Sequence, residues 1–427
     1  MDILVLGSGG REAALAEKLF DSDQCTRIYC APGNAGTARF GINVPMVDPC
    51  NAEQVVKYAK DMRIGLVVIG PEAPLVAGVA DAVREAGIEC FGPGKQGAQM
   101  EGSKEFAKAL MAKYDIPTAA YGAFDNLADA EAYINEQGAP IVIKADGLAA
   151  GKGVTVAETL EEALAAVREC FDGRFGEAGA SVVIEEKMTG PECSIMGITD
   201  GETMLCCEPA QDHKRAYEGD KGPNTGGMGV YSPVPIVTDE EHAAMIAIME
   251  QTLEALKSEG IDYRGCLYGG FMLTPKGPKV VEFNARFGDP ETQALMPRLK
   301  SDLVDVMMAA SQKRLSEVEL EWDDRFCVGV VLASEGYPGS YEKGKEVINL
   351  AKVEFEPDVY IYHAGTAYDH QVLLTSGGRV FCVSALAPTF EDARGLAYAV
   401  CNVLDFEGKY YRRDIGERAL KGREAWD

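Results

Sequence analysis

The sequence contains no apolar run that approaches the roughly 20 residues of a membrane span, and no apolar signal segment follows Met1. It also contains no C-x-x-C pair, although twelve cysteines are scattered along its 427 residues. Cys206 and Cys207 are adjacent in an apparent strand, where neighbouring side chains point to opposite faces, so they are poor disulfide partners. These absences predict a protein outside the membrane, with reduced thiols and a cytoplasmic location.

Basic residues are also scarce: 41 Lys and Arg face 67 Asp and Glu, which gives a net charge of −26. Such a charge repels nucleic acids and anionic membranes at long range, so neither is an expected partner. The expected partners are small molecules, and an anionic substrate would need a local cluster of cations. At roughly 150 residues per domain, the length predicts about three domains.

The first hundred residues alternate short apolar strands with helices, which predicts a doubly wound parallel sheet with ligands at the carboxyl ends of its strands. The first strand runs into the turn Gly7-Ser8-Gly9-Gly10-Arg11-Glu12 and then a helix. Such a turn suits an anion, so Gly9, Gly10 and Arg11 are candidate ligands of a phosphate-bearing substrate, with a structural turn as the alternative. Glu12 replaces the third glycine of a dinucleotide fingerprint, and no acidic residue follows the second strand, which argues against NAD or FAD.

A second loop is expected at the same edge of this sheet. The strand at residues 66–69 ends in Gly70-Pro71-Glu72. Because ligands bind beyond the carboxyl ends of such strands, Glu72 is a candidate for binding sugar hydroxyls. A solvated loop carboxylate is the alternative.

A triphosphate cradle is predicted between residues 141 and 154, where a lysine closes an apolar strand and a loop of small residues follows. The loop amides would fold over the phosphates while the strand lysine reaches them. The pattern is not a Walker sequence, because Gly153 follows Lys152 and no helix opens there. A helix that begins after Ser103 carries a further lysine, for which a solvated charge is the alternative. The candidate phosphate ligands are Lys104, Lys144, Gly151 and Gly153.

A nucleoside-reading segment is predicted after the apolar strand at residues 181–184. A backbone that leaves a strand with its amide and carbonyl free can bind an adenine edge, and a carboxylate a few residues later can bind the ribose diol. A strand that simply ends in a charged turn is the alternative. The candidates are Glu185, Glu186, Met188 and Glu192.

A dense basic cluster lies at residues 211–215, beside a glycine-rich loop at residues 219–229. A solvated charge run would not need so many glycines, whose use is close backbone approach. We therefore predict a loop that binds an anionic substrate. The candidates are Asp212, His213 and Lys214 in the cluster and Asn224, Thr225 and Gly226 in the loop, with Asp212 and Lys214 assigned to catalysis.

A metal site is predicted on the strand that begins at Val280. Glu282, Asn284 and Arg286 alternate along this stretch and so share one face. Oxygen ligands beside a fixed cation suit Mg²⁺ that also binds substrate phosphates. Beyond residue 323 the chain reads as a further α+β unit without a nucleophile-base constellation.

The ordered set of these motifs resembles the ATP-grasp superfamily and, within it, the phosphoribosylamine–glycine ligase (glycinamide ribonucleotide synthetase) family. The likeness covers essentially all 427 residues, and the stretch from Arg286 to Gln293 is its most discriminating motif. It implies an N-terminal doubly wound sheet, an ATP-grasp core and a small C-terminal α+β domain. The implied domains are residues 1–101 (N-terminal substrate domain), 102–118 with 191–322 (central ATP-grasp domain), 119–190 (lid subdomain) and 323–427 (C-terminal domain).

The resemblance also implies roles for the candidates. Lys104 and Lys144 would contact the phosphates of ATP, the backbone of residues 185–188 would read adenine, and Glu192 would hold the ribose. The pair at positions 282 and 284 would bind Mg²⁺ or Mn²⁺. The N-terminal turn, the loop at Asn224 and Arg286 would hold phosphoribosylamine and glycine, with Arg286 also assigned to catalysis.

One departure from the wider superfamily concerns the metal. Many members carry another acidic ligand on the preceding strand, which here reads Tyr268-Gly-Gly-Phe271. The expected reaction joins glycine to phosphoribosylamine through glycyl phosphate, in a monomer or weak homodimer. Another ATP-grasp ligase of purine metabolism, or a nucleotide-binding regulator without activity, remains an alternative.

Overall fold

The computed structural model describes residues 1–147, 153–174 and 179–422. Its N-terminal part is a five-stranded sheet in which all neighbouring strands are parallel. In spatial order, the strands are β3 (Ile42–Asn43), β2 (Arg27–Pro32), β1 (Asp2–Gly7), β4 (Ile64–Ile69) and β5 (Glu89–Phe91). Among these, β3 is a short edge strand that the sequence did not indicate.

Helices cover both faces of this sheet, as expected for a doubly wound fold. Alternate residues of β1 divide between two cores: Ile3 packs with Leu15 of one helix, and Leu4 packs with Val55 of another. The helices of this part are α1 (Gly10–Phe20), α2 (Ala52–Asp61), α3 (Glu72–Val76), α4 (Val79–Glu85) and α5 (Gln99–Gly102). The expected loop at Glu72 is therefore the first turn of a short helix, which still begins at the carboxyl end of β4.

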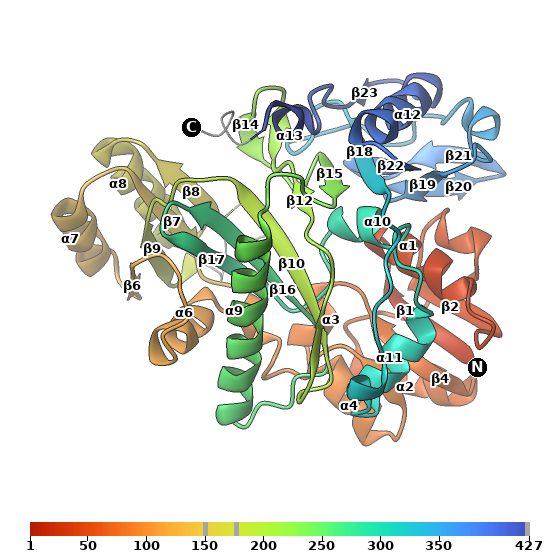
Figure 1. The fold of residues 1–427 in the computed structure, drawn as a ribbon, viewed down its shortest axis with the longest axis horizontal. Coiled ribbons are helices and arrows are strands. Elements are labelled where there is room, and N and C mark those ends of the chain that lie inside the picture. The colour runs from red at the N-terminus through yellow and green to blue at the C-terminus, as the bar shows by residue number, and fades with distance from the viewer. Residues whose placement is uncertain (148–152, 175–178, 423–427) are drawn as a thin grey trace.

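Two antiparallel sheets follow, and Figure 1 shows the smaller one at the end of the molecule far from the N-terminal part. The smaller sheet comprises β6 (Tyr121–Phe124), β9 (Val182–Glu186), β7 (Ile141–Ala145) and β8 (Val154–Ala157). It packs against α7 (Leu127–Gln137) and α8 (Leu160–Glu169) around its own apolar core. We call this part, residues 119–190, the lid. The central sheet comprises β11 (Met204–Cys206), β10 (Glu192–Thr199), β16 (Gly265–Thr274) and β17 (Gly277–Asn284).

The C-terminal sheet recruits strands from the middle of the chain. Two strands from within residues 211–232, inside the range expected for the central domain, pair into it. Its order is β12 (Gln211–Asp212), β15 (Gly229–Ser232), β18 (Phe326–Ser334), β22 (Arg379–Ala387) and β19 (Val359–His363), with β23 (Lys409–Tyr410) against β18. Two hairpins complete the strands: β13 (Arg215–Tyr217) with β14 (Lys221–Asn224), and β20 (Thr366–Asp369) with β21 (Val372–Thr375).

The remaining helices belong to the central and C-terminal parts of the chain. They are α6 (Lys104–Lys113), α9 (Asp239–Ser258), α10 (Glu291–Leu295), α11 (Leu303–Ser311), α12 (Phe390–Val403) and α13 (Glu417–Lys421). Among the described residues, none of the helices combines the length and apolarity required to traverse a bilayer. The predicted fold class, an N-terminal parallel sheet followed by antiparallel α+β parts, is confirmed; the domain boundaries remain predictions.

Candidate active site

Two lysines and a glutamate form a buried cluster between the lid and the central sheet. Lys144 Nζ lies 2.9 Å from Glu185 Oε1, and Lys108 Nζ lies 3.3 Å from the same oxygen. Lys144 Nζ also donates to the carbonyl of Val281 at 3.0 Å, and Lys108 Nζ donates to Thr118 Oγ1 at 2.8 Å. Burial lowers the pKa of Lys108 to about 8. The side chain of Glu185 thus fixes the strand lysine, a role that sequence reasoning did not give it.

Lys104 is fixed beside the predicted triphosphate loop. Its Nζ donates to the carbonyl of Gly147 at 2.9 Å, and Asp146 Oδ1 accepts the amide of Glu105 at 3.1 Å at the start of α6. Burial lowers the pKa of Lys104, although Glu282 opposes this effect. Gly151 lies outside the described residues. Gly153 pairs through its carbonyl with the amide of Ala145 at 2.8 Å, which closes the base of the loop.

A third cluster joins the predicted ribose and metal ligands. Lys214 Nζ lies 2.7 Å from Glu192 Oε2 and 3.8 Å from Glu282 Oε1. Burial disfavours the ammonium, but the two glutamates outweigh it and hold the pKa of Lys214 well above its usual range. Burial likewise acts against the charge on Glu282, yet Lys214 and Lys144 keep its pKa below the usual value. Glu282 is therefore ionised at neutral pH, as a metal ligand must be.

The Glu282 strand contains an irregularity beside the predicted metal ligands. Glu282 pairs with Gly270 of β16, whereas Val280 pairs with Phe271, so Val281 is an extra residue and its carbonyl reaches Lys144. In the favoured orientation of the Asn284 amide, its nitrogen donates to Glu101 Oε1 at 3.3 Å and to the carbonyl of Phe283 at 3.2 Å.

In this orientation the amide nitrogen of Asn284 makes these hydrogen bonds and its oxygen is the atom that could accept a metal beside Glu282. A carboxylate with an amide oxygen is a donor set that fits Mg²⁺ or Mn²⁺. Within the described part of the chain, no group of three His, Cys, Asp or Glu side chains is placed to hold a metal. The strand opposite Glu282 contributes Gly270, so the donor set from this pair of strands is the Glu282–Asn284 pair.

Arg286 lies between two carboxylates. Its Nη2 is 2.7 Å from Glu101 Oε1, and its Nε is 3.4 Å from Glu72 Oε2. Glu101 Oε2 also accepts the amide of Ala285 at 2.8 Å. Burial raises the pKa of Glu101 despite the arginine, whereas Arg286 and Arg11 overcome burial and lower the pKa of Glu72. The structure thus brings Glu72 and Arg286 together, although 214 positions separate them in the chain.

The N-terminal turn is held mainly by its own residues. Glu12 accepts the amide of Gly9 at 2.6 Å and the Nε of Arg11 at 2.6 Å. Gly7 has φ +123°, and a Cβ there would lie 2.5 Å from Glu12 Cγ, so this glycine makes room for the buried carboxylate. The amide of Arg11 donates to Asp289 Oδ2 at 3.2 Å. Glu12, which argued against a dinucleotide motif, therefore stabilises the turn through its carboxylate.

The first two residues of α1, Gly10 and Arg11, also contact the central part. A Cβ on Gly10 would lie 2.6 Å from Gln293 Nε2. The Arg11 guanidinium donates to the carbonyl of Phe287 at 3.0 Å. The predicted phosphate-binding turn thus packs directly on the stretch that follows Arg286.

The glycine-rich loop returns to the basic cluster. Thr225 donates through its amide and its Oγ1 to the carbonyl of Lys214, at 2.7 and 2.9 Å. Asn224 pairs with Arg215 across the β13–β14 hairpin. A Cβ on Gly226 would lie 2.9 Å from Arg379 Cζ. The close approach that the glycines allow is therefore, at Gly226, an approach to the C-terminal part of the chain.

His213 is buried and its neighbour Asp212 is half-buried. Burial raises the pKa of Asp212 to about 8, although Lys214 opposes this effect. His213 Nε2 accepts the amide of Gly416 at 3.2 Å, and burial lowers the pKa of its ring to about 4. The histidine thus faces the C-terminal part, and its contacts favour a structural role over direct substrate contact.

Glu186 and Met188 lie at the end of β9, where the lid strand leaves its sheet. Glu186 Oε1 is 3.1 Å from Lys279 Nζ and accepts the amide of Ala120 at 3.2 Å. Met188 is half-buried in the irregular segment before β10. Both residues are where a segment that reads a base edge is expected, and their roles remain predictions.

Sequence reasoning missed several residues that complete these clusters. Lys108 follows Lys104 by one helical turn, and this i, i+4 spacing was a usable signal. Asp289 lay inside the discriminating stretch from Arg286 to Gln293. Asp146 lay inside the predicted cradle at residues 141–154. The remaining missed residues are Glu101 and Arg379, for which the sequence offers no local signal.

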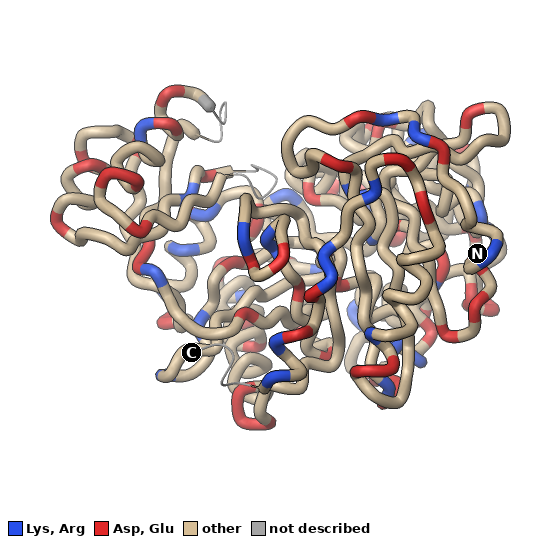
Figure 2. Tube along the Cα trace, turned by 90° about the horizontal axis from the view of Figure 1, so that it is seen from above, with Lys and Arg blue, Asp and Glu red and all other residues tan. Residues whose placement is uncertain are grey.

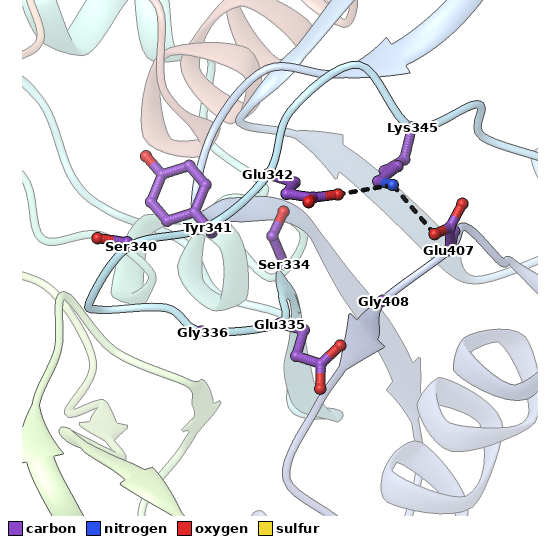
Figure 3. Close-up of a pocket in the computed structure, with 9 residues that line it drawn as sticks. All are labelled: Ser334, Glu335, Gly336, Ser340, Tyr341, Glu342, Lys345, Glu407 and Gly408. Atoms are coloured by element: carbon purple, nitrogen blue, oxygen red, sulfur yellow. Dashed lines mark hydrogen bonds and ion pairs between the residues drawn. The ribbon is translucent and has the colours of Figure 1, made fainter.

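Figure 2 shows acidic segments over the whole trace and several basic segments near its middle, between the lid and the N-terminal part. A separate hollow of about 510 Å³ lies in the C-terminal part (Figure 3). There Lys345 Nζ lies 2.8 Å from Glu342 and 3.0 Å from Glu407, so the cation is already neutralised. No predicted site residue lines this hollow.

Comparisons with known proteins agree with this arrangement. Family models described as phosphoribosylglycinamide synthetase N domain, ATP-grasp (A) domain and C domain match residues 1–101, 102–292 and 327–418. The chain is 49% identical over 426 residues to a phosphoribosylamine–glycine ligase of Brucella melitensis, covering 100% of both chains. It is 50% identical over 426 residues to one of Salmonella typhi, covering 99% of both.

Solved structures show the same relation. A crystal structure of phosphoribosylamine–glycine ligase from Thermotoga maritima has a TM-score of 0.86 at 34% identity, covering 97% of this chain and 100% of that one. A Campylobacter jejuni biotin carboxylase, with a TM-score of 0.73 at 13% identity and coverage of 96% and 92%, shares the fold alone. The chain therefore belongs to the phosphoribosylamine–glycine ligase family of ATP-grasp proteins.

Proposed function

We propose that this chain is an ATP-dependent carbon–nitrogen ligase that joins glycine to 5-phosphoribosylamine and gives glycinamide ribonucleotide, ADP and phosphate. Family membership over the full length supports this reaction of purine biosynthesis. The observation that carries the proposal is the juxtaposition of Lys144 and Glu282 with Arg286 and Glu72. The site thus has two adjoining halves. The ATP half, around Lys144 and Glu282, suits phosphates, and the acceptor half, around Arg286 and Glu72, suits an amine.

The chemical problem is that a free carboxylate is a poor acyl donor, because oxide would be its leaving group. We propose that a carboxylate oxygen of glycine attacks the γ-phosphorus of ATP and that ADP leaves. The amine nitrogen of phosphoribosylamine then attacks the carbonyl carbon of glycyl phosphate, phosphate leaves, and the nitrogen loses a proton. The chain contributes positioning and charge neutralisation, and no covalent protein nucleophile is needed.

Each cluster of the site would perform a different part of this reaction. Lys104 and Lys144 would neutralise the phosphates, and Glu192 would bind the ribose diol once Lys214 moves toward the transferred phosphate. Glu282 and Asn284 would hold Mg²⁺ or Mn²⁺, which would neutralise charge on the β- and γ-phosphates. Closure of the lid would keep water from the acyl phosphate; its separate apolar core supports movement as a unit.

The remaining predictions about the site also belong to this proposal. Arg286, Asn224 and the turn at Gly9 would hold the acceptor substrates. We expect the protein to act in the cytoplasm as a monomer or weak homodimer. Analytical ultracentrifugation with and without substrates tests the assembly.

The decisive experiment measures ADP formation with freshly generated phosphoribosylamine, with glycine present or absent. Strict glycine dependence supports the proposal. ADP formation that requires bicarbonate instead indicates another ligase of this fold, and ATP binding without turnover indicates a regulator. Glycine labelled with ¹⁸O in its carboxylate tests the intermediate: one labelled oxygen must appear in the released phosphate, and unlabelled phosphate contradicts glycyl phosphate.

A further inference from the structure

The C-terminal part of the chain holds the backbone of the glycine-rich loop from two sides. Arg379, the first residue of β22, donates from Nη1 to the carbonyl of Gly226 at 2.5 Å. The amide of the same glycine donates to the hydroxyl of Tyr337 at 3.1 Å. Both polar groups of one loop residue are therefore bound by side chains of the C-terminal part: Arg379 on β22 and Tyr337 in the turn after β18.

The same guanidinium also reaches the stretch that follows Arg286. Its Nη1 donates to the carbonyl of Asp289 at 3.0 Å, and its Nη2 lies 3.3 Å from Asp289 Oδ1. The other carboxylate oxygen of Asp289 accepts the amide of Arg11 at 3.2 Å. Arg379 thus binds the glycine-rich loop and the Arg286 stretch, and Asp289 links both to the N-terminal turn, so that three elements assigned to the acceptor substrates are joined.

The fit around this guanidinium leaves little freedom. The Arg379 side chain is 20% exposed and that of Asp289 is 15% exposed. Gly227 has φ +112°, and a Cβ there would lie 2.4 Å from Pro290 Cδ, so the loop lies flat against the Asp289–Pro290 turn. The guanidinium presents its donors in a fixed planar fork that matches the two carbonyls and the carboxylate, whereas an ammonium on a flexible chain has no such preset geometry.

We propose that Arg379, with Tyr337, is a positioning residue of the acceptor-substrate site, through which the C-terminal part fixes the glycine-rich loop against Asp289. The proposal rests on the proposed function, because it assigns the loop to phosphoribosylamine and glycine. It gives the C-terminal part a role in the reaction without substrate contact. Within the described residues, the hydrogen bonds of Arg379 go to Gly226, Gly227 and Asp289 and to none of the lysines assigned to ATP, so ATP affinity should be independent of Arg379.

The test uses Arg379→Ala, Arg379→Lys and Tyr337→Phe in the full chain, with Arg325→Ala as the matched control. Arg325 is also an arginine of the C-terminal part that binds carboxylates, 2.8 Å from Asp323 and 2.9 Å from Asp358. KM values for ATP, glycine and phosphoribosylamine are measured separately, and thermal unfolding checks the fold of each variant.

For Arg379→Ala we expect KM for at least one acceptor to rise about tenfold or more, with KM for ATP within about twofold of wild type, as for loss of a charged hydrogen bond. Arg379→Lys should restore only part of the effect. Tyr337→Phe removes one hydroxyl and should raise the same KM by about two- to fivefold. Arg325→Ala should match wild type.

Equal losses for ATP and the acceptors, or unchanged acceptor KM values in folded Arg379→Ala and Tyr337→Phe proteins, would overturn the positioning role. Failure of the proposed function has a different signature, because the wild-type protein would then show no glycine-dependent ADP formation. The Tyr337→Phe variant keeps the test informative if Arg379→Ala does not fold.

Discussion

The Lys108–Glu185–Lys144 cluster places one carboxylate between two ammonium groups, whereas the Arg286 cluster places one guanidinium between Glu72 and Glu101. The first has an excess of positive charge and suits the triphosphate of ATP. The second has an excess of negative charge and suits an amine or hydroxyl donor, as found on glycine and phosphoribosylamine. The two halves of the site are therefore distinguished by charge balance as well as by position.

The two halves also differ in the kind of cation that they use. The ATP half relies on lysines, which are flexible point charges that can exchange a protein carboxylate for a phosphate. The acceptor half relies on arginines, whose planar groups are each held by several partners. We infer that the ATP half rearranges when it binds its ligand, whereas the acceptor half is built in advance.

The largest expected effect is a loss of turnover at the predicted metal pair, Glu282 and Asn284, which serves both halves of the site. Glu282→Gln keeps the shape of the side chain but removes the charge that a metal requires, so turnover at ordinary Mg²⁺ should fall by about 10²- to 10³-fold, as for other groups that stabilise developing charge. Titration of Mg²⁺ and Mn²⁺ against ADP formation measures this change. The control is Glu317→Gln, which removes a surface carboxylate 2.8 Å from Arg314. Near-wild-type activity would remove Glu282 from the site.

The second prediction concerns the acceptor half. Arg286→Ala leaves the buried Glu101 without its cation and should destabilise the fold by about 3 to 5 kcal/mol. It should also reduce kcat/KM for glycine or phosphoribosylamine by about 10²-fold, or about 2.7 kcal/mol, with a much smaller change in ATP affinity. An equal loss for all three substrates would indicate a structural role instead.

A second substitution separates stability from function at this site. Glu101→Gln added to Arg286→Ala removes the stranded charge, so the double variant should recover much of the unfolding free energy without recovering activity. Thermal or urea unfolding measures the first quantity and steady-state kinetics the second. Recovery of both would mean that Arg286 serves only to neutralise Glu101.

The third prediction is the counterpart in the ATP half. In Lys144→Met, Glu185 still lies 3.3 Å from Lys108, so the stability loss should be smaller than for Arg286→Ala. ATP affinity should fall about 30-fold, the loss expected for about 2 kcal/mol of charged contact with phosphate. Isothermal titration with ATP tests this expectation, with Lys257→Met on the exposed face of α9 as the control. Unchanged ATP affinity would contradict the assignment.

These contrasts show which features were readable from the sequence. The strand at Lys144 and the strand that carries Glu282 and Asn284 follow from local periodicity and were predicted correctly, whereas Arg286 lies in a bend two residues beyond the end of β17. Glu101 and Arg379 belong to elements remote from their partners, and their importance arises only when the sheets assemble. The side chain of Glu185 lay within a predicted segment, but its position between two lysines depends on the packing of α6 against β9.

The last prediction concerns stability at the contact between the C-terminal part and the N-terminal turn, which supports the acceptor half. We call this contact, formed by His363, Asn34 and Ser8, the seam. His363 is 1% exposed; its Nδ1 lies 3.0 Å from Thr366 Oγ1, and its carbonyl accepts Asn34 Nδ2, which also binds the carbonyl of Ser8 in the N-terminal turn. Burial lowers the pKa of this ring to about 3, and Arg39 adds to the effect.

Because the unfolded chain binds this proton near pH 6.5 and the folded protein does not, the His363 contribution to stability is present at pH 7 and is lost as pH falls toward 3. At pH 5, protonation of this histidine in the unfolded chain should lower the free energy of unfolding by about 2 kcal/mol. His363→Asn keeps a polar atom near Thr366 and should flatten the dependence of unfolding on pH between 7 and 5. His370→Asn, at a side chain 97% exposed, should leave that dependence unchanged. If His363→Asn retains the full wild-type slope, the acid sensitivity lies elsewhere than in this seam.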